Sequence, residues 1–296
     1  MAETHPAINR QTWKQHINSY KRTPGSLVLF LLVCASAFIT VAVLAMLIGY
    51  ILVRGIPHLN LSLFEWIYST ENVSMMPSLI NTILMVLLSL LIAAPVGIAS
   101  AVYLVEYAKR GNKFVEVIRL TTETLQGIPS IVYGLFGALF FVKTLGWGVS
   151  LVSGACTLSI MILPLIMRTT EEALMSVPDN YRQGSLGLGA GKLRTVFRVV
   201  LPSAIPGILS GIILATGRIV GETAALIYTA GSIAKVPNSI FDSTRTLSVH
   251  MYNLSKEGMH TEQAYATAVV LLVMVIGINL LSDWLAGRLV KSNCGE

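Results

Sequence analysis

Two residues of opposite charge lie inside one long apolar stretch of this sequence, and their spacing suits anion chemistry. Arg218 and Glu222 are four residues apart within residues 203–229, so on a continuous helix they would share one face. A charge at the centre of a bilayer costs about 2.5–3.5 kcal/mol on insertion scales, so such residues are kept for a partner or a function. A guanidinium presents a planar fork of donors that matches the oxygens of an oxyanion. The pair therefore favours a path for an anion; a self-neutralising intrahelical ion pair is the structural alternative.

The carboxylate of Glu222 adds a second chemical capability. It could hold the guanidinium of Arg218 in place when no anion is present, or accept a proton from a hydrogen phosphate ion, which sulfate does not offer. Arg168 and Glu171 form a similar pair at the end of an earlier apolar run. Arginine at a membrane end is also a common orientation or snorkelling signal, and that alternative has more weight there.

The sequence around these charges is suited to lipid rather than to water. Of 296 residues, 54% are hydrophobic and only 12% are charged, whereas soluble domains carry about 25% charged residues. A helix needs about 20 apolar residues to cross the hydrocarbon layer, and most of the apolar runs meet this requirement. We therefore predict an all-α membrane protein with six transmembrane helices, in residues 26–53, 77–105, 128–142, 146–167, 203–229 and 264–286.

Basic residues in the connecting segments predict the orientation. They gather before the first run and in alternate connections, whereas the other connections carry few. The positive-inside rule then places both termini in the cytoplasm, with a leader in 1–25 and a tail in 291–296. We predict a multi-pass protein of the cytoplasmic (inner) membrane. Its net charge of +6 suits anionic lipid headgroups and acidic partner surfaces rather than nucleic acid.

Motifs for catalysis and for metal or nucleotide binding are missing from the sequence. Gly191-Lys192 matches the end of a phosphate-binding P-loop, but leucine occupies positions 186 and 193, where the motif requires glycine and Ser or Thr. The cysteines and histidines lack metal-ligand spacing, and we expect His250 and His260 on the surface. We therefore predict no catalytic residue, no metal site and no cofactor in this chain, so ATP hydrolysis would belong to a separate subunit.

The longest predicted cytoplasmic connection is the segment 168–202. Asp179 has the residue type and the position of a helix N-cap. Gly187, Gly189 and Gly191 then predict a turn, and a short amphipathic helix follows it. Two short helices around a glycine turn form a projection that fits a groove on a partner protein. An ordinary solvated loop is the alternative.

This segment resembles the cytoplasmic loop of binding-protein-dependent ABC importer permeases. The family pattern is Glu-Ala-Ala, three residues, Gly, nine residues and Ile-x-Leu-Pro. The spacing is intact here, although a different tripeptide replaces Glu-Ala-Ala and removes its carboxylate. The resemblance implies a coupling helix that docks on the ATPase subunit. The coupling residues that it implies are Gln183, Gly184, Ser185, Gly187, Gly189, Leu201 and Pro202.

Three further stretches are similar to one branch of that family, the PstA phosphate permeases. They are residues 127–135, the motif Arg168-Thr-Thr-Glu171, and residues 217–230. The resemblance implies the MetI-like ABC permease fold, with the permease domain in residues 26–290. The residues that it implies in phosphate translocation are Arg218, Glu222, Arg168 and Glu171.

The resemblance also implies the rest of an ATP-driven phosphate importer. A PstC-like permease would form a heterodimer with this chain, and two PstB-like ATPase subunits would use the ATP. A PstS-like phosphate-binding protein would dock on the outer loop in residues 230–263. Two other functions stay open. One is a permease for another oxyanion, such as molybdate or sulfate. The other is a passive anion channel or secondary transporter, although such a device would not need the coupling segment.

Overall fold

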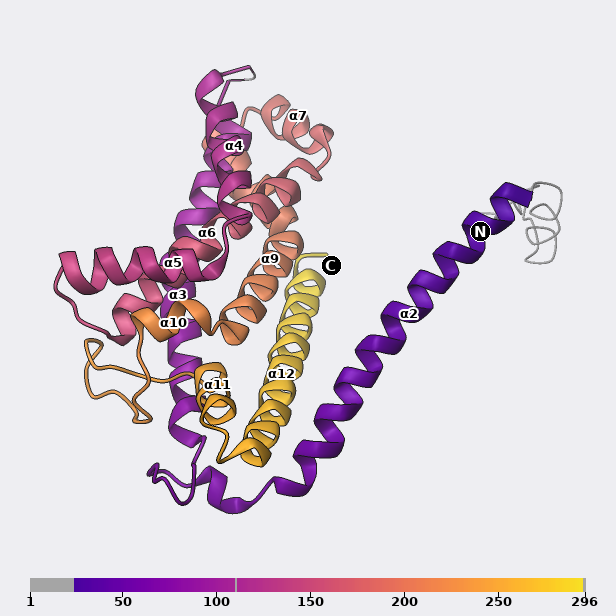
Figure 1. Ribbon diagram of the computed structural model, residues 1–296. Coiled ribbons are helices and arrows are strands. Elements are labelled where there is room, and N and C mark those ends of the chain that lie inside the picture. The colour runs from indigo at the N-terminus through magenta and orange to yellow at the C-terminus, as the bar shows by residue number, and fades with distance from the viewer. Residues whose placement is uncertain (1–23, 110, 295–296) are drawn as a thin grey trace. The chain divides into compact units, whose positions relative to one another are not determined.

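The computed structural model describes residues 24–109 and 111–294, whose regular elements are all helices (Figure 1). Most of the predicted leader in 1–25 lies outside the described residues, as do Arg110 and the end of the predicted tail in 291–296. The chain separates into two compact units that divide after Val53. The first unit contains most of α2 (Pro24–Gly55), a 32-residue helix that agrees with the first predicted span.

The second unit holds the other helices and begins with two short 3-10 turns, η1 (Ile56–His58) and η2 (Leu61–Phe64). Three π-helical stretches prolong its helices: η3 (Tyr103–Tyr107) after α3, η4 (Ala138–Thr144) after α5, and η5 (Val196–Val200) between α8 and α9. The α-helices in chain order are α3 (Met76–Val102), α4 (Lys113–Gln126), α5 (Ser130–Gly137), α6 (Leu151–Met175), α7 (Asp179–Gly187), α8 (Lys192–Thr195), α9 (Leu201–Gly221), α10 (Ala224–Thr229), α11 (Leu247–Glu257) and α12 (Thr261–Cys294).

The number of membrane crossings depends on one bent pair of helices. Among the described residues, five helices are long and apolar enough to span a membrane, and α4 with the α5–η4 helix adds a sixth if the pair counts as one. The predicted third span, 128–142, matches the second arm of this pair, Ser130–Thr144, and α4 forms the first arm, which meets it at a bend of 101°. Pro129 is extended at the bend, and a proline disfavours helical geometry in the residue before it. Tyr133 Oη donates to the carbonyl of Leu125 at 2.8 Å and closes the corner.

The predicted fifth span, 203–229, is not one helix. The helix α9 ends one residue before Glu222, whose backbone is extended at ψ 127°, and α10 begins two residues later. Backbone groups freed by such a break must find partners inside a membrane protein. The Glu222 carboxylate accepts from the backbone N–H of Ala225 at 3.1 Å, and its carbonyl accepts from Ser248 Oγ at 2.7 Å. The break is thus stabilised by specific hydrogen bonds.

The core of the second unit forms where α3, α6 and α9 pack together, and Figure 1 shows α12 beside α9. Small residues let these helices approach closely. A Cβ on Gly207 of α9 would lie 2.5 Å from the Cβ of Ala173 in α6, and one on Gly134 of α5 would lie 2.7 Å from the Cα of Ala225 in α10. Helices in such close contact hold their polar side chains in fixed places. Fully buried core side chains include Met85, Leu158, Met161, Ile162, Ile166, Ile219 and Leu226.

The segment between α10 and α12 is tied to the start of α3. Asn81 Nδ2 donates to the carbonyls of Lys235 and Arg245, at 2.9 and 3.2 Å. The backbone N–H of Leu247 donates to Thr82 Oγ1 at 2.8 Å. These bonds fix the segment between α10 and α12 against the start of α3.

His250 does not lie on the surface, contrary to the prediction; it is 0% exposed, whereas His260 is half-buried. Its ring meets Tyr68 edge-on, and the guanidinium of Arg245 lies 4.7 Å from the centre of the same Tyr68 ring. Burial lowers the pKa of His250 to about 3, and the nearby Arg245 charge acts in the same direction. The imidazole is therefore neutral at physiological pH, and its role here is packing.

Candidate functional site

A groove beside α9 contains the arginine that the sequence singles out. We call it the Arg218 groove; it has a volume of about 610 Å³. This volume is within the range of about 300–1,000 Å³ that is typical of ligand sites. Its polar side chains come from Arg218, Ser210 and Asn279, and the last of these belongs to α12. The remaining lining residues are Leu165, Ile213, Leu214 and Gly217.

The Arg218 side chain is half-buried and keeps its charge unpaired. Among the residues that the structure describes, it takes part in none of the ion pairs and none of the hydrogen bonds. It does lie in the last turn of α9. The carbonyl end of a helix favours a cation there. The helix terminus therefore helps to hold a guanidinium whose donors stay available to a ligand.

Glu222 does not form an ion pair with Arg218, the structural alternative to an anion path, because the chain leaves helical geometry at Glu222 itself. The i,i+4 relation holds only on a continuous helix, and here α9 stops first. The Glu222 side chain is 9% exposed and accepts from the backbone of α10, and it is not among the residues that line the groove. A self-neutralising pair is thereby excluded for this conformation. Glu222 shapes the helix break instead.

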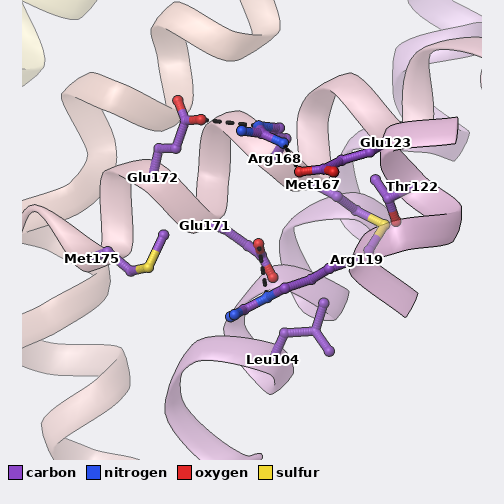
Figure 2. Close-up of a pocket in the computed structure, with 9 residues that line it drawn as sticks. All are labelled: Leu104, Arg119, Thr122, Glu123, Met167, Arg168, Glu171, Glu172 and Met175. Atoms are coloured by element: carbon purple, nitrogen blue, oxygen red, sulfur yellow. Dashed lines mark hydrogen bonds and ion pairs between the residues drawn. The ribbon is translucent and has the colours of Figure 1, made fainter. Parts of the chain in front are cut away.

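A second polar site lies between α4 and α6, where five charged side chains form what we call the α4–α6 charge cluster (Figure 2). They line a cavity of about 170 Å³. Arg168 bonds to Glu123 and, through Nε at 3.1 Å, to Glu172. Glu171 pairs with Arg119 at 3.6 Å. Glu123 and Arg119 both reach across from α4, so the predicted neighbouring pair of Arg168 and Glu171 does not form.

The charge balance of the α4–α6 charge cluster limits what it binds in this conformation. Three carboxylates meet two guanidinium groups, which leaves a net negative charge. Glu171 Oε1 is buried without a hydrogen-bond partner in the described structure, so the cavity lacks donors rather than acceptors. An anion reaches these arginines only after the ion pairs open. The cluster and the Arg218 groove share no lining residue.

The sequence reasoning did not identify Arg119 and Glu123 as parts of this site. A signal was present, because the two are four residues apart on α4 and so share one helix face. Asn112 caps the start of α4, where its side chain accepts from the backbone N–H of Phe114 at 3.0 Å. That cap fixes where α4 begins.

The predicted projection on the coupling segment is present as α7, a turn, and α8; we call it the α7–α8 projection. Gly189 occupies the turn with φ +83°, a conformation that favours glycine. Gly187 instead ends α7, and Gly191 is the extended N-cap of α8. Ser185 Oγ and Thr195 Oγ1 lie 2.9 Å apart and link the two helices. The predicted glycine turn therefore needs the left-handed conformation at one position only.

Two details of the α7–α8 projection differ from the prediction. Pro178, not Asp179, is the N-cap of α7, and Asp179 is the first helical residue. The second short helix is not separate, because α8, η5 and α9 run on as one 30-residue span from Lys192 to Gly221. Leu201 and Pro202 thus lie within that span, directly after the π-helical stretch η5.

A half-buried arginine that the sequence reasoning missed anchors the α7–α8 projection. Arg182 Nη2 and Nε donate to Glu106 of η3 at 2.8 and 3.0 Å. Its other bonds reach the carbonyls of Leu174 and Val177, at 2.8 and 2.7 Å, and the Asp179 side chain. The Arg182 side chain is 18% exposed and that of Glu106 is 8% exposed. One side chain thus joins α3, α6 and α7.

The tip of the α7–α8 projection is exposed and partly apolar. Gln183 and Gly184 are exposed on α7, and the apolar Leu188 in the turn is 91% exposed. Clustered exposed apolar side chains on a projection indicate a protein contact. The other large exposed apolar residues of this region are Tyr181, Leu186, Leu193 and Phe197.

Known proteins are similar in sequence to this chain over most of its length. Residues 93–293 match the family described as the binding-protein-dependent transport system inner membrane component. The probable ABC transporter permease protein YqgI of Bacillus subtilis is 36% identical, over 86% of this chain and 92% of its own length. The phosphate transport system permease protein PstA of Xylella fastidiosa is 33% identical, over 83% of this chain and 90% of its own length.

A solved structure shares the fold at lower sequence identity. A chain in the crystal structure of a bacterial alginate ABC transporter, in complex with a pentasaccharide-bound periplasmic protein, superimposes with a TM-score of 0.68. The match covers 92% of this chain and 98% of that chain at 15% identity. This likeness concerns the fold, and it confirms the predicted ABC permease architecture.

Proposed function

The chain belongs to the family of binding-protein-dependent transport system inner membrane components, and from this premise we propose that it is the phosphate-translocating permease subunit of an ATP-driven importer. Members of the family are transmembrane permease subunits of ABC importers, whose ATPase is a separate subunit. The chain is accordingly a multi-pass membrane protein. The more specific part of the proposal is that phosphate is its substrate. Relatives that are named phosphate transport system permeases support this part.

The unpaired guanidinium of Arg218 is the observation that carries this proposal. A multivalent oxyanion needs a fixed positive charge with available donors to enter a membrane protein, because desolvation of the ion is costly. Arg218 offers both in a groove that is otherwise mostly apolar. Arginine pairs two donors with two phosphate oxygens, which a lysine cannot do in the same geometry.

The α4–α6 charge cluster then serves as a second binding site, further along the same translocation path. We assign Arg168 the role of binding the anion and Glu171 the role of controlling the charge of the anion. Each of the two side chains is held by a counterion on the neighbouring helix α4. Separation of α4 from α6 would free the arginines, and their return to the carboxylates would expel the anion. Glu222 contributes indirectly, by stabilising the helix break beside Arg218.

The partners follow from the family and from the exposed surfaces. The family implies an ATPase and a solute-binding protein; we propose two PstB-like ATPase subunits, docked on the α7–α8 projection, and a PstS-like protein at residues 230–263. A PstC-like permease would complete the Arg218 groove from its open side. The ATPase subunits use the ATP, both termini face the cytoplasm, and the location is the inner membrane.

Reconstituted transport tests the proposed function. The chain is purified with the second permease and the ATPase of the same organism, placed in liposomes, and given the phosphate-binding protein on the outer side. We expect uptake of radiolabelled phosphate that requires ATP, stops with vanadate, and persists in excess molybdate or sulfate. ATP-independent flux would establish a channel or secondary transporter. Competition by molybdate or sulfate would establish another oxyanion as the substrate.

Substitution of Gly189 by valine tests the coupling role of the α7–α8 projection. A left-handed conformation costs an L-residue about 1–2 kcal/mol, and branching at Cβ adds to this strain, so the turn is expected to change shape. We expect ATP hydrolysis that the binding protein no longer stimulates, with transport reduced about tenfold or more.

The matched control is Gly191→Ser, at the N-cap of α8, where an added Cβ meets nothing within 4 Å and the backbone is extended. Serine is among the preferred N-cap residues, so this variant should transport normally. Unchanged coupling in Gly189→Val would show that the projection does not dock on the ATPase.

A further inference from the structure

The helix α12 places one amide side chain in the Arg218 groove. Asn279 lies within an apolar stretch of α12, between Ile278 and Leu280. It lines the groove together with Arg218, although the two residues are far apart in the sequence. The helices α9 and α12 pack side by side (Figure 1). This packing brings both side chains to the groove.

The side chain of an asparagine in a membrane helix needs a hydrogen-bond partner, because an amide without one in an apolar environment costs free energy. Within the described chain, the side chain of Asn279 forms no hydrogen bond, and the residue is half-buried. The lining residues around it are apolar except for Arg218 and Ser210. Its amide hydrogens and its carbonyl oxygen therefore face the space of the groove.

The two side chains have complementary hydrogen-bonding chemistry. Arg218 only donates, whereas the amide of Asn279 donates through Nδ2 and accepts through Oδ1. Monohydrogen and dihydrogen phosphate present both bare oxygens and at least one O–H group. The bare oxygens match the guanidinium and Nδ2, and the O–H group matches Oδ1. A fully ionised oxyanion such as sulfate leaves Oδ1 without a donor, which a buried site penalises.

We propose that Asn279 is a binding residue for the transported oxyanion and contacts, together with Arg218, a phosphate ion that carries a proton. The inference rests on the proposed function and extends it. It moves the acceptor for the phosphate proton from Glu222, whose carboxylate is engaged with α10, to a neutral amide. A neutral acceptor has the advantage that it leaves the positive charge of Arg218 uncompensated, whereas a carboxylate would compete with the anion.

Substitution of Asn279 by leucine and by glutamine tests this assignment in the reconstituted importer. Leucine is similar in size and inserts well into membranes, so assembly should be preserved. We expect the maximal rate of phosphate uptake to fall about tenfold with leucine, in line with the loss of a hydrogen bond to a charged group. We expect glutamine, which keeps the amide, to retain most of the rate. Leu280→Ala, one residue along and exposed, is the matched control and should transport normally.

A role in subunit packing gives a different result. Polar side chains also form hydrogen bonds between membrane helices, and loss of such a bond would lower the yield of the assembled complex. Asn279→Leu with poor co-purification of the second permease and a normal uptake rate per assembled complex would overturn the assignment. So would leucine and glutamine variants that are equally impaired.

The same experiment separates this inference from the proposed function. Wild-type liposomes that accumulate phosphate, together with full activity in Asn279→Leu, would overturn the role of Asn279 and leave the importer function intact. Wild-type liposomes without phosphate uptake would overturn both. A double-mutant cycle with Arg218→Lys adds a direct check, because residues that contact one anion should show effects that do not add.

Discussion

Arg218→Gln is expected to lower phosphate uptake by about two orders of magnitude or more, because removal of one partner of a desolvated charge pair costs about 3–5 kcal/mol. Glutamine keeps hydrogen-bond donors in the groove but removes the positive charge. The anion would then have to leave water for a groove whose other lining groups are neutral. Uptake of radiolabelled phosphate, normalised to the amount of assembled complex, measures the effect.

Two further variants define what Arg218 contributes. Arg218→Lys keeps the charge as a point without the planar fork, so we expect it to be intermediate between the wild type and Arg218→Gln. Arg198→Gln is the matched control, because Arg198 is exposed on η5 and lines neither polar site. The complex should assemble in all three. Normal uptake by Arg218→Gln would refute the anion path through this groove.

Arg182→Met is expected to uncouple ATP hydrolysis from transport. The change leaves Glu106, which is 8% exposed, without its cation, and breaking a buried pair in this way costs about 3–5 kcal/mol. It also leaves the carbonyls of Leu174 and Val177 without the guanidinium that holds them. The helix α7 should then lose its fixed position relative to α3 and α6. Stimulation of the ATPase by the binding protein reports this loss.

The control for Arg182→Met is Arg198→Met, which removes an exposed arginine from the neighbouring stretch η5. Exposed charges contribute little to stability, so this variant should stay coupled. Glu106→Gln should fall between the two, because it removes the charge and leaves no buried carboxylate unpaired. Intact coupling in Arg182→Met would show that α7 is positioned by other contacts.

Several features of this protein could be predicted from the sequence because they depend on local composition. The share of charged residues and the length of the apolar runs predict membrane helices, and α2, α3, α6, α9 and α12 are found where such runs occur. The turn at Gly189 was predicted from glycine spacing, and its φ of +83° agrees. These features are decided within one or two helical turns of chain.

The helix break at Glu222 needed the tertiary structure. The residues from Arg218 onward are compatible with a continuous helix, and no proline interrupts them. A bond from Ser248, on the distant helix α11, satisfies the carbonyl of Glu222 and stabilises the break. The sequence places Arg218 and Glu222 on one face, and the fold separates them.

Sequence by itself determined that this chain is a bundle of membrane helices. It also determined that one span contains an arginine and that a projection with a glycine turn lies between two spans. Tertiary structure alone decided the partners of the charges: Arg168 with Glu123, Glu171 with Arg119, and Arg218 with none in the described chain. The same packing brought Asn279 to Arg218 and buried His250. The physical reason is that hydropathy and backbone preference act locally, whereas a charge or an amide takes its partner from whichever helix lies beside it.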